Sequence, residues 1–118
     1  MQTDQAIKAF SQSEKLKTGI IWATQIAEVC LALPESEKPG AEKILKTLIG
    51  MIASEIHIAK NAAPHKIWLE AERDVNTAQV MLNSGVAHDT SHHLTQALSK
   101  ITTIGQQSMT LLVEKGLL

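Results

Sequence analysis

The chain has 118 residues, which is the size of a single domain with its own hydrophobic core. Hydrophobic residues make up 44% of it, and 11 basic residues nearly balance 12 acidic ones. This composition excludes intrinsic disorder and provides no general attraction to the phosphates of nucleic acids. The single cysteine, Cys30, excludes an intramolecular disulfide and suits a reducing compartment. No apolar run reaches the ~20 residues that span a bilayer, and no signal peptide is visible. We therefore expect a cytoplasmic protein that does not bind membranes, and the balanced charge adds the expectation that it does not bind nucleic acid.

Four amphipathic segments follow one another, and all show helical rather than strand periodicity. Pro34 ends the first, because the residue before a proline avoids the helical region. Pro64 suits the first turn of the third, and Gly85 suits the left-handed position after its end. Asp89, Thr90 or Ser91 caps the fourth. The predicted bounds are about residues 4–33, 41–61, 64–83 and 90–115.

Short connections between consecutive helices favour antiparallel neighbours. The chain is therefore predicted to be a single all-α domain over residues 1–118, an antiparallel up-down-up-down four-helix bundle. In the first helix, the face predicted to point inward holds Phe10, Ile20, Ala27 and Leu31. In the second helix, it holds Ile44, Leu45, Leu48, Met51, Ile52, Ile56, Ile58 and Ala59. Leu69 and Val80 of the third helix are expected to face outward.

A second apolar stripe lies on the first helix, away from its predicted core face. It consists of Trp22, Ile26, Val29 and Leu33, whose spacings of four, three and four residues place them on one side of a helix. Monomeric proteins normally avoid such a patch, so we expect a partner to cover it, with a two-fold homodimer favoured. The alternatives are a central position of this helix, or cover from the loop at residues 34–40 or from Leu117 and Leu118.

Glu55 is the candidate buried polar residue, since it falls inside the apolar arc predicted for the second helix. A buried carboxylate needs a partner or becomes neutral. Lys17 or Ser108 is the expected partner. The main reading is a satisfied core residue or one that reaches the rim, and the alternative is an acid or metal ligand.

Two histidine patterns offer an alternative function. His57 and Lys60 match the His-x-x-Lys core of histidine phosphotransfer domains, which resemble this chain in size and helical architecture. As phosphoacceptor, His57 would have to be exposed. Two features depart from that family: Asn61 replaces the small residue expected after the lysine, and Pro64 ends the helix where the family's helix continues.

A metal site is the other histidine-based possibility. His88 and His92 are four residues apart, a spacing that chelates one ion if the helix extends back to His88. Dinuclear carboxylate sites of four-helix bundles need Glu-x-x-His motifs, and this chain has none. No cofactor and no catalytic motif are indicated. The sequence thus predicts a non-enzymatic interaction protein that self-associates or serves as a subunit or adaptor.

Overall fold

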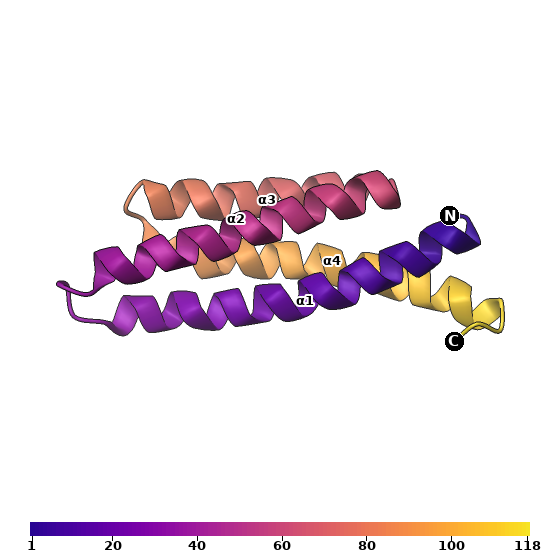
Figure 1. Ribbon diagram of the computed structural model, residues 1–118, viewed down its shortest axis with the longest axis horizontal. Coiled ribbons are helices and arrows are strands. Elements are labelled where there is room, and N and C mark those ends of the chain that lie inside the picture. The colour runs from indigo at the N-terminus through magenta and orange to yellow at the C-terminus, as the bar shows by residue number, and fades with distance from the viewer.

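The computed structural model describes all 118 residues and is all-helical (Figure 1). Its helices are α1 (Thr3–Ala32), α2 (Lys38–Ala62), α3 (Lys66–Asn83) and α4 (Thr90–Glu114), with a short 3₁₀ turn, η1 (Ala87–Asp89), before α4. Each helix packs against two others, α1 on α2 and α4, and α3 on α2 and α4. The predicted antiparallel four-helix bundle is confirmed.

Proline and glycine residues determine where several of the helices begin and end. Leu33 is extended in front of Pro34 and ends α1, as predicted. α2 begins three residues earlier than predicted, because Pro39 fits its first turn, where no amide hydrogen is needed. Gly85 has a φ of 82° after α3, the left-handed conformation expected of it.

The connection between α2 and α3 differs from the prediction. Pro64 lies in the connection, and α3 begins two residues after it rather than with it. His65 caps the new start, since its ring Nδ1 accepts a hydrogen bond from the Ile67 amide at 3.1 Å. The fully buried Trp68 donates its ring N–H to the Ala63 carbonyl at 3.0 Å. The side chains of His65, the cap of α3, and of Trp68 thus stabilise the connection between α2 and α3.

The buried residues of each helix recur at alternating intervals of three and four, and we call each such row the inner seam of its helix. This period of 3.5 is typical of helices that cross at about 20° in left-handed bundles. In α1 the inner seam is Ala6, Ala9, Ser13, Leu16, Ile20, Ala23, Ala27 and Cys30. In α2 it is Leu45, Ile49, Ile52, Ile56 and Ala59, and in α3 it is Trp68, Ala71, Val75, Ala78 and Leu82. In α4 it is Thr90, Leu94, Ala97, Ile101, Ile104 and Ser108, after which the alternation ends because the next buried residue, Leu112, follows by four.

Part of the predicted core is wrong. Ile44, Met51 and Ile58 were expected inside, yet their side chains are 70%, 61% and 50% exposed. Each lies one residue before a member of the inner seam of α2, so the buried face is rotated away from them. In α1 the buried face is rotated in the opposite sense, because Cys30 is buried and Leu31, one residue after it, is exposed. The exposed positions predicted for Leu69 and Val80 on α3 are confirmed.

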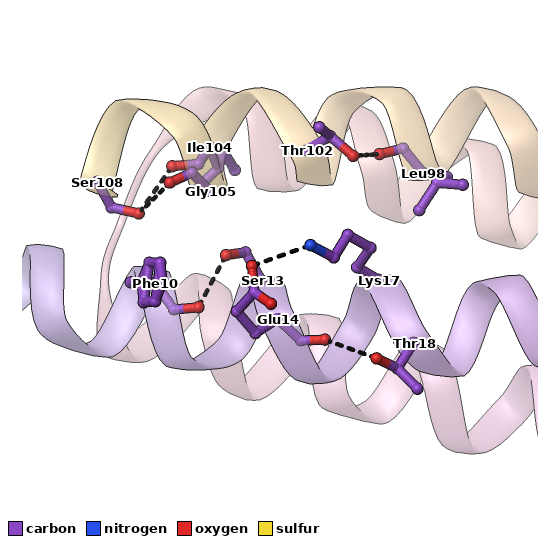
Figure 2. A network of polar contacts seen from close by, with 10 residues as sticks. All are labelled: Phe10, Ser13, Glu14, Lys17, Thr18, Leu98, Thr102, Ile104, Gly105 and Ser108. Atoms are coloured by element: carbon purple, nitrogen blue, oxygen red, sulfur yellow. Dashed lines mark hydrogen bonds and ion pairs between the residues drawn. The ribbon is translucent and has the colours of Figure 1, made fainter. Parts of the chain in front are cut away.

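α1 and α4 approach each other closely where both carry small residues (Figure 2). A Cβ atom added to Gly105 would lie 2.8 Å from the Oγ of Ser13. The hydroxyl groups of Ser13 and Ser108 donate to carbonyls of their own helices, so this contact is packing rather than hydrogen bonding. At the end that holds both termini, α1 and α4 project beyond α2 and α3 (Figure 1), and the bundle measures 54 × 20 × 17 Å.

Candidate protein-binding surface

The second apolar stripe of α1 lies on the surface. The side chains of Trp22, Ile26 and Val29 are 62%, 38% and 60% exposed. Leu33 is half-buried and follows the last residue of α1 as its cap. The exposure of Trp22 shows that no other part of the chain covers it.

α2 extends this surface. A shallow groove of 700 Å³ between α1 and α2 is lined by Gly19 and Trp22 of one helix and by Leu48 and Met51 of the other. Ile44 precedes Leu48 by four residues and therefore lies on the same side of α2. We call the surface formed by Gly19, Trp22, Ile26, Val29, Ile44, Leu48 and Met51 the α1–α2 face.

The residues of the α1–α2 face form a second row on each helix, which we call the outer seam. Every position of it lies one residue before a position of the inner seam, so it repeats the same alternation of three and four residues. The outer seam of α1 is Lys15, Gly19, Trp22, Ile26 and Val29. That of α2 is Ile44, Leu48, Met51, Glu55 and Ile58. A row with this spacing is the pattern by which one helix packs along another.

Within the outer seams, charged groups are confined to one end. Lys15 Nζ and Glu55 Oε2 form an ion pair at 3.1 Å across α1 and α2. From there toward the α1–α2 loop the outer seams are uncharged. Of the positions that flank them on the solvent side, Thr18, Gln25, Thr47 and Ser54 are uncharged, whereas Glu28 beside Val29 and Lys43 beside Ile44 are charged; the outer seams themselves carry no charge over this stretch. An exposed helix surface without charge is typical of a contact surface.

Glu55 does not lie in the core. Its side chain is 31% exposed at the rim of the groove, and its partner is Lys15 rather than the predicted Lys17 or Ser108. Lys17 pairs with Glu14 of its own helix at 3.0 Å (Figure 2). Of the two positions expected for Glu55, in the core or at the rim, the structure has the rim, because Glu55 belongs to the outer seam.

His57 is exposed, as a phosphoacceptor must be, but its surroundings are acidic. The Nζ of Lys60 contacts both carboxylate oxygens of Glu72, at 3.1 and 3.3 Å. Glu72 Oε2 also lies 3.9 Å from the Nδ1 of His57. The motif lysine is therefore engaged by a carboxylate that would repel a phosphate on His57.

His88 and His92 do not share one helix. His88 belongs to η1, whereas α4 begins at Thr90. The Nε2 of His88 lies 3.6 Å from Asp89 Oδ1, and the Nε2 of His92 lies 3.2 Å from the side-chain nitrogen of Gln96. No group of three or more histidine, cysteine, aspartate or glutamate side chains is arranged to hold a metal ion.

The lone thiol is inert in this fold. Cys30 is 5% exposed and packs in the core, as expected of a small hydrophobic residue. Its burial raises the pKa of the thiol, and the negative charge of Glu42 raises it further. The thiol therefore stays protonated at neutral pH and offers no nucleophile.

No helix has the length and hydropathy needed to cross a membrane. Comparisons with protein-family models, with curated proteins and with solved structures find no match to this chain.

Proposed function

We propose that this protein is a non-enzymatic interaction module that acts by binding another helical protein surface, or a further copy of itself, through the α1–α2 face. The observation that carries the proposal is the apolar outer seam on both helices. Side chains as large as Trp22, Ile44 and Met51 are each more than 60% exposed there. A monomer gains nothing from such exposure, whereas a partner that covers it gains hydrophobic free energy.

The size of the gain is adequate for association. At about 25 cal/mol per Å², covering roughly 500 Å² of apolar side chain contributes on the order of 12 kcal/mol before the entropy lost on association is subtracted. The helices on either side of the face are tied to the rest of the bundle by their inner seams. The face is consequently rigid, and little conformational entropy is lost when a partner binds.

The geometry favours no second function. A phosphoacceptor role for His57 conflicts with the acidic Glu72 beside it. A metal role for His88 and His92 has no third ligand and no common helix. A cytoplasmic location belongs to the proposal, because reducing conditions suit a chain with one free thiol.

The test compares two double variants of the tagged chain in extracts of cells that naturally make it. Trp22→Glu with Ile26→Glu places two charges on the α1–α2 face. Leu69→Glu with Val80→Glu places the same charges on exposed apolar positions of α3. The native mass of the tagged species is measured by size-exclusion chromatography with light scattering.

We expect the wild-type chain and the α3 variant to elute in a complex heavier than one 12.8 kDa chain. The α1–α2 variant is expected at the mass of a single chain, with unchanged helical circular dichroism because both substituted positions are on the surface. A wild-type chain that elutes as a monomer in the extract would refute the proposal.

A further inference from the structure

We propose that the occupant of the α1–α2 face is a second copy of this chain, placed by a two-fold axis parallel to the helices, so that α1 of each copy lies on α2 of the other. This inference rests on the proposed function and names its partner. The two α1–α2 pairs would then form a third, intermolecular four-helix bundle between the two that exist within the chains.

The spacing of the outer seams supports this arrangement. Within the chain, α1 and α2 are antiparallel and pack through inner seams that alternate by three and four residues. The outer seams alternate in the same way. The proposed axis keeps α1 of one copy antiparallel to α2 of the other, so the geometry that holds each chain together is repeated between the copies.

Charge complementarity selects the direction of the axis. Lys15 and Glu55 lie at one level of the bundle, because they contact each other within the chain. An axis parallel to the helices keeps this level, so Lys15 of each copy faces Glu55 of the other. An axis perpendicular to the helices would instead bring the charged end of one copy onto the apolar end of the other. Only the parallel axis pairs opposite charges and buries the uncharged remainder.

The shape of the groove supports the same contact. Gly19 has no side chain, and a Cβ atom built on it would touch only Ile52 Cγ1, at 3.9 Å. The groove is therefore hollow beside Gly19, at the level of Trp22 and Met51. In the proposed dimer, the Trp22 ring of each copy lies on α2 of the other and fills the hollow beside Gly19. This is a contact of knob and hole, made twice.

The exposed area matches the requirement of a dimer. Stable complexes bury about 800 Å² per partner, of which roughly 60–65% is apolar in homodimers. The exposed parts of Trp22, Ile26, Val29, Ile44 and Met51, with smaller parts of Leu48, supply on the order of 500 Å² per copy. The polar side chains that flank the face, including the charged Glu28 and Lys43, supply the polar rim.

Two purified single variants test the contact. Gly19→Leu fills the hollow and leaves the knob, while Trp22→Ala removes the knob and leaves the hollow open. Gly19→Leu adds apolar surface to the face, so association that is hydrophobic but nonspecific would become stronger. The proposed dimer predicts weaker association, by at least about tenfold in the dimerisation constant for either variant alone.

Mixing the two variants is the decisive step. In the heterodimer, Trp22 of the Gly19→Leu chain enters the open hollow of the Trp22→Ala chain. At the second contact, the leucine side chain added at position 19 occupies the space from which the Trp22 ring has been removed. We expect light scattering to show dimers in the equimolar mixture at a concentration where each variant alone is monomeric. Gly50→Leu is the matched control: it lies on the α3 side of α2, near Gln79, and should dimerise like the wild-type chain.

Two results would overturn the inference. A purified wild-type chain that stays monomeric at all concentrations excludes the second copy, and the proposed function then survives only if the extract contains a complex that depends on Trp22. A wild-type dimer whose mixed variants form no heterodimer excludes this geometry, while it leaves self-association in place. The two failures are thus separable.

Discussion

The two tryptophans of the chain have opposite environments, and each environment has a physical consequence. Trp68 is fully buried, and its ring N–H is bonded to the Ala63 carbonyl. Trp22 is mostly exposed, and its ring lies on the apolar α1–α2 face. Large aromatic rings with this exposure often anchor protein interfaces, because their burial contributes much free energy at little cost in side-chain entropy. Trp22 is therefore the side chain expected to contribute most to binding through the α1–α2 face.

Cys30 provides a prediction about pH. Burial raises the pKa of its thiol in the native state, with Glu42 as the second cause. Above about pH 8.5 the unfolded thiol loses its proton while the native thiol keeps it, so the native state binds more protons. The free energy of unfolding should therefore decrease as the pH rises through this range, and it should be independent of this group below it.

Urea denaturation at a series of pH values from 7 to about 10 measures the effect. Cys30→Ala is the control, because it removes the thiol and leaves the titration of the lysines in place. The wild-type chain should lose more stability than the variant over this range. Equal pH dependence of the two proteins would show that the thiol does not titrate as its burial requires.

At the level of the helices, α1 and α2 each carry two apolar rows, and only one of them is needed by the fold. The inner seam of α2 contains Leu45, Ile49 and Ile52, and its outer seam contains Ile44, Leu48 and Met51. α3 carries only the isolated Leu69 and Val80 on its outer surface. α4 exposes Met109 and Val113 near its end, so a second apolar row along the length of the helix is found only on α1 and α2.

Replacement of glycine by alanine is expected to have opposite effects at Gly50 of α2, which has space for a side chain, and at Gly105 of α4, which contacts α1 closely. Gly50→Ala should stabilise the protein by up to about 1 kcal/mol, because alanine has the higher helix propensity and the nearest atom, Gln79 Nε2, is 3.8 Å from the new Cβ. Gly105→Ala should destabilise it by about 1 kcal/mol, because the new Cβ would lie 2.8 Å from Ser13 Oγ.

Thermal or urea denaturation distinguishes the two variants. Adding Ser13→Ala to Gly105→Ala removes the clashing oxygen and should restore most of the lost stability. If Gly105→Ala were as stabilising as Gly50→Ala, the helices would not approach as closely as described.

Much of this arrangement could be predicted from the sequence, because helical periodicity, Pro34 and Gly85 determine the elements and their short connections determine the topology. The buried face of α2 could not be chosen from periodicity alone. Both of its seams are largely apolar, and their positions are offset from each other by one residue. An arc drawn at 100° per residue therefore includes parts of both. Only packing against α1 and α3 decides which seam is inside.

One signal would have identified the outer seams. Lys15 and Glu55 each belong to the outer seam of their helix, and a charged residue marks the row that faces solvent. Helical periodicity instead placed Ile44 and Met51 inside, and Glu55 was interpreted as an exception within that apolar arc. Trp22, Ile26 and Val29 were recognised as a surplus stripe because α1 already had a core face. The contribution of α2 to the surface was missed.

For the molecule as a whole, the four sides of the bundle are not equivalent. The α2–α3 side carries the ion pair of Lys60 with Glu72, and the α3–α4 side carries that of Asp74 with Lys100. On the α1–α4 side the helices are in close contact at Ser13 and Gly105, and the ion pair of Glu14 with Lys17 lies beside this contact. The α1–α2 side has one ion pair at its end and an exposed apolar surface along the rest. Association through this one side gives a closed dimer rather than an open chain of molecules.

The most direct test of the central claim is the mass of the purified wild-type chain in solution. Light scattering is measured across a range of concentrations, with a chelator present so that the histidines cannot link chains through adventitious metal. We expect a species of twice the 12.8 kDa chain mass that dissociates on dilution. A mass of 12.8 kDa at every concentration would contradict self-association through the α1–α2 face.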